Sequence, residues 1–167
     1  MIKIMGLYMG KVYTDINELR YGSIMIMTDQ DHDGSHIKGL LINFIHHFWP
    51  SLLKIRGFLK EFVTPIIKAT KGNDSKSFFT ISDYERWLES VPDGRLWRIK
   101  YYKGLGTSTA AEAKEYFKAI TDHTISFRHS NDKSEDDSIN LAFSKTLADS
   151  RKDWLSHYDK DVCIDHR

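Results

Sequence analysis

The chain has 167 residues, a formal net charge of +1 and 41% hydrophobic residues, so its length and apolar content fit one domain with a buried core. The near-neutral charge excludes binding of nucleic acid by bulk attraction alone, so that any such binding depends on local arrangement. The single Cys163 excludes a disulfide framework or a cysteine-based zinc site, and without a bilayer-spanning apolar run or a signal peptide we expect a soluble intracellular protein.

The first predicted element is a buried strand over the apolar residues 24–27, and an acidic cluster follows it directly. Asp29, Asp31 and Asp33 alternate there, and their mutual repulsion is tolerable only if they are solvated or bind a cation. Mg²⁺ prefers such hard oxygen ligands and keeps waters or phosphate oxygens in its shell. We therefore predict a magnesium site at the end of this strand, which Mn²⁺ could also occupy.

Three other interpretations apply to the same residues. An EF-hand calcium loop has this opening but needs a Glu at its twelfth position, where this chain has Leu40, so that interpretation fails. A phosphotransferase of the haloacid-dehalogenase type also places Asp-x-Asp after a buried strand, but it gives no reason for the third Asp. A solvated acidic turn that caps a helix remains the alternative without function.

A long amphipathic helix is predicted next, because apolar residues recur at spacings of three and four. They are Ile37, Leu40, Leu41, Phe44, Ile45 and Phe48. Ser35 is the expected cap, and Pro50 marks a kink or the end. Lys38 would lie near the helix N-terminus, where backbone N–H groups already favour an anion, so it is a candidate phosphate contact.

Two strands and a short helix are expected in the middle of the chain. Residues 62–68 form a strand that Pro65 interrupts, which places it at an edge or gives it a bulge, and residues 78–81 form the other. Ser82 and Glu85 resemble a capping box that opens the helix. Its core side is expected to carry Tyr84, Trp87 and Leu88.

A second strand-to-helix loop follows at Lys103-Gly104-Leu105-Gly106. The alternation over residues 97–102 predicts the strand, and Thr109 with Glu112 forms the capping box of the next helix. Two glycines let a backbone approach a phosphate closely, and Lys103 adds a mobile positive charge. Flexible turns of this kind are common, and most of them bind nothing.

The last part of the chain is predicted to contain an exposed loop and a final helix. Residues 129–138 are polar and charged, which is typical of a solvated loop. Leu147, Trp154, Leu155 and Tyr158 indicate a helix that carries Arg151 and Lys152 on its side. An ordinary amphipathic helix with solvated cations is the alternative.

Five segments together resemble the TOPRIM domain of type IIA DNA topoisomerases, and specifically the eukaryotic-type topoisomerase II. The metal motif of that family matches residues 24–44 almost residue for residue, and the other matching segments are 100–109, 112–117, 141–145 and 151–155. The resemblance covers nearly the whole chain. It implies an α/β fold, a Rossmann-like parallel-sheet TOPRIM domain with flanking helices. Residues 1–167 would be this domain with a C-terminal extension toward a winged-helix domain.

The resemblance also implies roles for individual residues. Asp29 and Asp31 would bind the metal, with Asp33 beside them in the acidic cluster. Arg151 and Lys152 would contact the DNA backbone, and Lys103 with its glycine loop would lie near the same site. No catalytic residue is expected in this chain, because the family's catalytic Glu precedes the metal motif and its nucleophilic Tyr lies in a later domain.

The complete enzyme of this family is a nuclear homodimer that cleaves, passes and reseals double-stranded DNA, coupled to ATP. The resemblance implies that this chain handles DNA together with the missing portions of such an enzyme. We expect it to bind no ATP and, by itself, to bind metal weakly and cut nothing. Two alternatives remain open: a stand-alone TOPRIM nuclease, for which Glu61 is the nearest candidate acid, and a non-catalytic DNA-binding or interaction fragment.

Overall fold

A computed structural model describes residues 1–91, 96–102, 104–130 and 132–157, which fall into two compact units, 1–128 and 129–167. The first unit contains α1 (Ile2–Met5), η1 (Ile16–Glu18), β1 (Ile24–Met27), α2 (His32–Phe48), α3 (Pro50–Leu53), β2 (Leu59–Phe62), β3 (Ile67–Lys71), β4 (Asp74–Phe78), α4 (Ile81–Ser90), β5 (Arg98–Tyr101), η3 (Leu105–Thr107), α5 (Ala110–Lys118) and β6 (Thr124–Ser126). The second contains α6 (Lys133–Phe143), η4 (Lys145–Leu147) and α7 (Ala148–Ser156).

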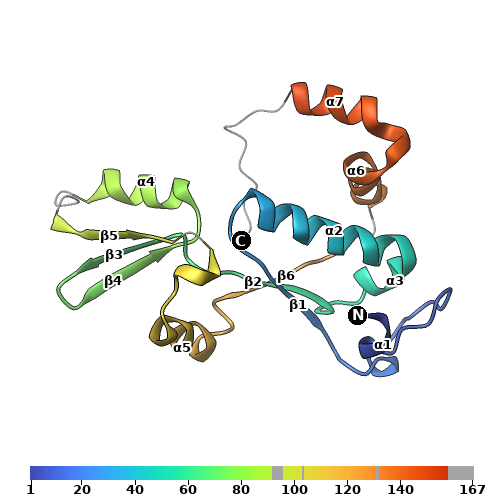
Figure 1. Cartoon of the computed structure of the whole chain (residues 1–167), viewed down its shortest axis with the longest axis horizontal. Helices are drawn as coiled ribbons and strands as arrows, with labels where there is room; N and C mark the ends of the chain where they lie inside the picture. The colour runs from blue at the N-terminus through green and yellow to red at the C-terminus, as the bar shows by residue number, and fades with distance from the viewer. Residues whose placement is uncertain (92–95, 103, 131, 158–167) are drawn as a thin grey trace. The chain divides into compact units, whose positions relative to one another are not determined.

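The first sheet has the order β1-β2-β6 and holds the main core (Figure 1). Strand β1 pairs with β2 in parallel, and β6 adds to β2 in the antiparallel direction. Helix α2 leads from β1 toward β2 and packs one side on this sheet, where its Ile45 is fully buried together with Trp49, which follows α2, and Leu52 of α3. Parallel neighbours need a crossover connection, and α2 with α3 provides it between β1 and β2. The other strand pairs among the described residues are antiparallel.

The apolar stripe predicted on α2 is only partly buried. Ile45 lies in the core and Phe44 packs against it, whereas Ile37, Leu40 and Phe48 are exposed. The periodicity therefore predicted the helix correctly but not the full extent of its buried face.

The second sheet has the order β4-β3-β5 and is antiparallel throughout. Helix α4 covers one of its faces, where Ile67, Ala69 and Phe78 pack against Tyr84 and Trp87. The single strand expected over residues 62–68 is instead two strands, because β2 and β3 belong to different sheets and the buried Pro65 lies between them. Proline has no N–H for a strand ladder, so it marks the passage between the sheets.

The α/β class is confirmed, and the sheets are one mixed and one antiparallel rather than a single parallel sheet. Some expected boundaries were wrong. The strand predicted over residues 78–81 ends at Phe78, and Thr80, not Ser82, caps α4 by accepting from the amide of Asp83. The loop predicted over residues 129–138 contains the start of α6, because Asp132 caps it and Glu135 and Asp136 lie in its first turn. Acidic side chains there stabilise a helix through its dipole.

The predicted final helix is confirmed as α7, and Tyr158 lies outside the described residues. Among the helices that the structure describes, none is both long and apolar enough to cross a membrane.

Candidate functional site

The three aspartates lie where β1 gives way to α2, at the carboxyl end of the strand. Asp29 is in the connecting turn, Asp31 is the N-cap residue of α2, and Asp33 is in its first turn. All three side chains are exposed. Helix α2 thus begins at His32, before the predicted cap Ser35, because Asp31 supplies the cap. The negative charges also oppose the positive end of the helix dipole.

The Asp31 carboxylate has a fixed position. Its Oδ1 accepts a hydrogen bond from the amide of Gly34 at 2.8 Å, and its carbonyl accepts from the amide of Ser35 at 3.0 Å. A capping interaction of this kind uses one carboxylate oxygen. The other oxygen accepts no hydrogen bond from any residue that the structure describes, so the capping interpretation and the metal interpretation are compatible.

Gly34 makes the tight turn around Asp29 possible. A Cβ built on Gly34 would overlap the backbone carbonyl of Asp29. Any larger residue would push α2 away from the acidic turn. The Asp-Gly spacing within the motif is therefore a steric requirement of this turn.

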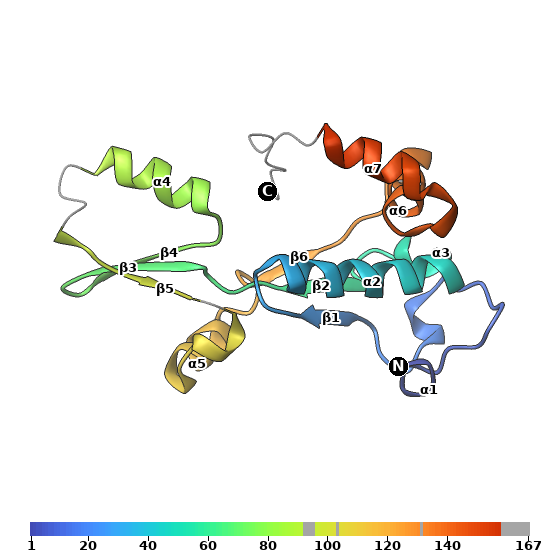
Figure 2. The ribbon, with the colours of Figure 1, turned by 45° about the horizontal axis from the view of Figure 1, so that its top comes forward.

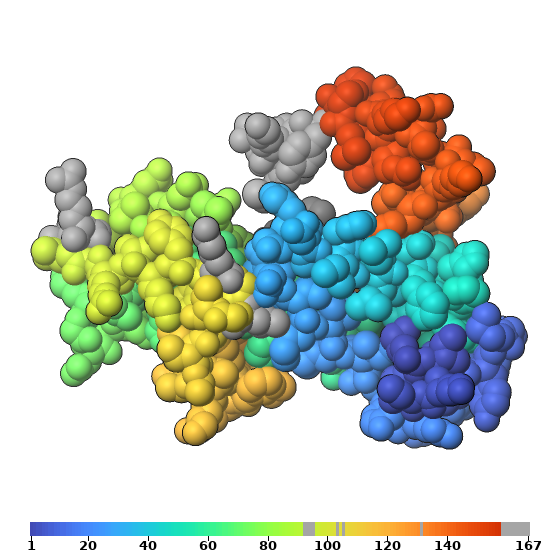
Figure 3. Space-filling model, in the orientation of Figure 1, coloured from blue at the N-terminus to red at the C-terminus, as the bar shows by residue number. Residues whose placement is uncertain are grey.

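The glycine loop after β5 reaches the same place. A Cβ built on Gly104 would overlap the carboxyl group of Asp29, and Gly104 has the left-handed φ of 73°. Figure 3 shows the yellow segment after β5 directly beside the blue segment after β1. Two loops far apart in the sequence therefore meet at one carboxylate. Lys103 itself lies outside the described residues.

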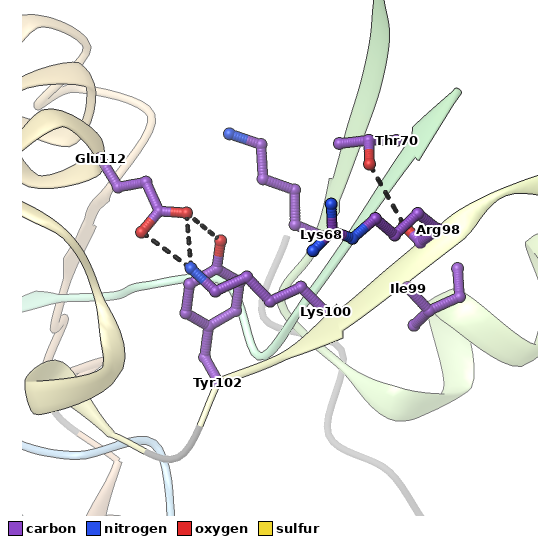
Figure 4. Close-up of a pocket in the computed structure, with 7 residues that line it drawn as sticks. All are labelled: Lys68, Thr70, Arg98, Ile99, Lys100, Tyr102 and Glu112. Carbon is purple, nitrogen blue, oxygen red and sulfur yellow. Dashed lines mark hydrogen bonds and ion pairs between the residues drawn. The ribbon is translucent and has the colours of Figure 1, made fainter. Parts of the chain in front are cut away.

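A hydrogen-bonded network around Glu112 holds the two ends of the glycine loop together (Figure 4). Before the loop, the Tyr102 hydroxyl donates to Glu112 at 2.5 Å, and Lys100 Nζ lies 2.9 and 3.0 Å from the two carboxylate oxygens. After the loop, the amide of Thr109 donates to Glu112 at 2.7 Å, which confirms the predicted capping box. A single carboxylate thus links the segments that flank residues 103–108.

The electrostatics of Glu112 follow from these contacts. Burial disfavours its charged form, but the hydrogen bonds that it accepts, first among them that from Thr109, outweigh burial and lower the pKa of Glu112 to about 2. Burial, followed by the hydrogen bond to this carboxylate, raises the pKa of Tyr102 well above its usual range. At neutral pH Glu112 is therefore an anion, and the Tyr102 hydroxyl that donates to it is neutral.

We expect Glu112→Gln to lower the free energy of unfolding at pH 7 by about 2 kcal/mol, because the charge-assisted hydrogen bonds are lost. The lowered pKa means that this contribution is present above the ordinary value of 4.5 and is lost as the pH falls toward 2. Urea titrations at several pH values should thus show the two proteins converging in acid. Glu115→Gln is the control, since its pair with Lys68 at 3.3 Å is exposed and should matter far less. A difference that persists at pH 2 would contradict the ionic origin.

Lys38 does not extend to the helix N-terminus as an unpaired cation. Its Nζ lies 2.8 Å from Oε1 of Glu61, which is 5% exposed on β2 and stands opposite Ile26 of β1. The ion pair explains how a charged residue is tolerated in a buried strand. The sequence signal was the Glu within the apolar segment over residues 58–63, which required a partner. Contact of Lys38 with DNA stays a prediction.

Arg151 and Lys152 belong to the second unit and differ in their surroundings. Arg151 Nη1 donates to the carbonyls of Leu141, Ala142 and Ser144 at 3.0, 3.0 and 3.1 Å, and so caps the end of α6 from α7. Lys152 is exposed and pairs with Asp149 at 3.0 Å. This structural role of Arg151 was missed by sequence reasoning. DNA contact by either residue stays a prediction.

The described residues do not by themselves form a complete set of metal ligands. Among residues 1–91, 96–102, 104–130 and 132–157, no group of three or more His, Cys, Asp or Glu side chains is close enough to hold a metal ion. Asp29 and Asp31 provide exposed carboxylate oxygens at one turn, which suits an ion that keeps several waters or phosphate oxygens.

Comparisons with known proteins place the chain in a family. The family model described as the C-terminal associated domain of TOPRIM matches residues 62–167. DNA topoisomerase 2-alpha of Cricetulus griseus is 55% identical over 163 residues, with 96% of this chain and 11% of that protein covered. DNA topoisomerase 2-beta of Homo sapiens is 56% identical over 163 residues, with 96% and 10% covered.

A solved structure agrees with these relatives. The crystal structure of the Plasmodium falciparum topoisomerase II DNA-binding, cleavage and re-ligation domain matches with a TM-score of 0.91 and 56% identity, over 99% of this chain and 22% of that chain. The chain spans about a tenth of the length of the curated relatives that it matches. It belongs to the eukaryotic-type DNA topoisomerase II family.

Proposed function

We propose that this chain is the metal-binding part of the DNA cleavage site of an ATP-dependent type II topoisomerase, which cleaves, passes and reseals double-stranded DNA. The observation that carries the proposal is the meeting of two loops at Asp29: Gly34 packs on its backbone and Gly104 packs on its carboxyl group. Such close packing fixes the direction of an exposed carboxylate, which a solvated turn would not need.

Mg²⁺, or Mn²⁺ in its place, is the proposed cofactor, held by Asp29 and Asp31 with Asp33 beside them. When bound, such an ion neutralises phosphate charge and stabilises a leaving oxygen. The residues of this chain would orient the site: the cap on α2 holds Asp31, and the glycine loop holds Asp29. Further ligands would come from the remaining parts of the enzyme.

DNA is the proposed substrate, with Lys103, Lys38, Arg151 and Lys152 as candidate backbone contacts. Of these, Lys152 has an exposed ammonium group whose partner Asp149 is exposed as well, so exchange for a phosphate would cost little. The homodimeric assembly, the use of ATP by other parts of the enzyme and a nuclear location belong to the same proposal. No ATP is expected to bind this chain.

Asp29→Asn and Asp31→Asn test the proposal. Each variant, mixed with the remaining parts of the topoisomerase, should lose DNA cleavage and plasmid relaxation in Mg²⁺ by about 100-fold or more, because a metal ligand is removed. Asn caps a helix as well as Asp, so α2 should remain folded, as circular dichroism would verify. Asp132→Asn is the matched control, since Asp132 caps α6 in the same way.

Two outcomes would overturn the proposal. Normal cleavage by both variants would remove these residues as metal ligands. Cleavage of plasmid by the purified chain alone in Mg²⁺ would favour the nuclease alternative instead, because no further protein would then be needed.

A further inference from the structure

The sheet β4-β3-β5 has a second face that the proposed cleavage site does not use. The register places Lys68 opposite Ser77 and Lys100, and places Thr70 opposite Ser75 and Arg98. Side chains opposite one another share a face of a sheet. We call this set the open sheet face, and it consists of Lys68, Thr70, Ser75, Ser77, Arg98 and Lys100.

The open sheet face is polar throughout, whereas the other face packs against α4. Figure 2 shows α4 over one side of the sheet, and α5 meets the other face through Glu112 and Glu115, which pair with Lys100 and Lys68. A pocket of about 300 Å³ lies on this face, with Lys68, Arg98 and Lys100 in its lining (Figure 4). The three cations in its lining suit an anionic group such as a phosphate.

Acidic side chains neutralise the cations at only one end of the open sheet face. Lys68 and Lys100 stand directly opposite each other, and like charges at such positions repel. Glu115 and Glu112 of α5 neutralise them, at 3.3 and 2.9 Å. The ion pair with Glu112 therefore gives Lys100 a structural role. The longer pair with Glu115 gives Lys68 such a role only in part.

Arg98 is different, because its neighbour across the sheet is Thr70 and not an acid. Within the described residues, the guanidinium group of Arg98 makes no hydrogen bond and no ion pair, and only its backbone carbonyl accepts from Thr70. The exposed Ser75 stands beside Thr70 on the next strand. An exposed guanidinium group on a strand surface that also carries Thr70 and Ser75 provides donors that match a phosphate.

We propose that the open sheet face binds the phosphate backbone of a DNA duplex through Arg98, with Lys68 as the second cation. The identity of the polyanion as DNA rests on the proposed function. Strand β5 continues into the glycine loop that packs on Asp29, so the two regions are connected by a short segment. At about 3.3 Å per residue, Arg98 is at most roughly 20 Å from Gly104, which corresponds to about six phosphates along one strand of a duplex. A duplex held at the cleavage site could therefore reach this face.

The test measures binding of the 167-residue chain to a fluorescently labelled random-sequence duplex by anisotropy, in EDTA and over a range of salt concentrations. Without divalent metal, the proposed metal site does not contribute. Arg98→Gln should weaken binding about three- to tenfold at low salt and reduce the salt slope by about 0.9, as expected for one lost phosphate contact. Lys68→Gln combined with Arg98→Gln should weaken it further.

Arg86→Gln is the matched control, because Arg86 is an exposed arginine on α4, on the opposite side of the same sheet. It removes the same charge and should leave binding and the salt slope unchanged. Equal losses for both arginine variants would show only a bulk charge effect and would overturn the proposal, as would unchanged binding by Arg98→Gln. This assay contains no divalent metal and measures binding alone, so a failure of the proposed cleavage function is detected separately, in the cleavage assay with Mg²⁺.

Discussion

Gly104→Ala is expected to reduce DNA cleavage by the reconstituted topoisomerase about 100-fold, although Gly104 carries no functional group. The added Cβ would overlap the carboxyl group of Asp29, so either this carboxylate or the glycine loop must move. A displacement of about 1 Å at a reacting centre typically costs on the order of 10²-fold in rate. The substitution also places a side chain at φ 73°, which adds about 1–2 kcal/mol of backbone strain.

Two kinds of control separate displacement from strain. Gly57→Ala and Gly72→Ala introduce Cβ atoms at φ 78° and 60°, but the new atoms meet nothing within 4 Å. They should lower stability to a similar extent and leave cleavage unchanged. Gly106→Ala lies in the same loop, also with nothing within 4 Å, and should be nearly neutral. Full cleavage activity of Gly104→Ala would show that the contact with Asp29 does not position the carboxylate.

The second large effect concerns stability. Lys38→Met should lower the free energy of unfolding by about 3 kcal/mol, because it leaves the buried carboxylate of Glu61 without its cation. Urea denaturation of the chain at pH 7 measures this change. If Lys38 acts mainly through DNA, as the sequence suggested, the variant would instead keep its stability and lose affinity for DNA.

A double variant and an exposed pair complete this experiment. Lys38→Met combined with Glu61→Leu removes both charges, so most of the lost stability should return, since an apolar pair of similar volume can replace a buried ion pair. Lys11→Met breaks a pair of nearly the same length, 2.9 Å to Glu18, but at the surface. Its effect should be far smaller. Equal effects at the two sites would mean that burial of Glu61 is not the cause.

Features fixed by neighbouring residues were predictable from the sequence. The strand over residues 24–27, the helix that ends before Pro50 and the capping box of Thr109 and Glu112 all depend on short-range hydrogen bonds and side-chain periodicity. Errors arose where two residues competed for one local role. Asp31 took the cap expected of Ser35, and Thr80 took the cap expected of Ser82, because each lies at the position from which its side chain meets the first free amides.

The sequence by itself determined the α/β class, the acidic turn after β1 and the family, because these depend on residue order and local pattern. Only the tertiary structure decided which distant groups meet: Gly104 at Asp29, Lys38 at Glu61, and Arg151 at the end of α6. Tertiary pairing also divided the strands between two sheets and left Arg98 on an open face. The physical reason is that such contacts form when packing of the whole unit brings separate segments together, and no local preference of the backbone encodes them.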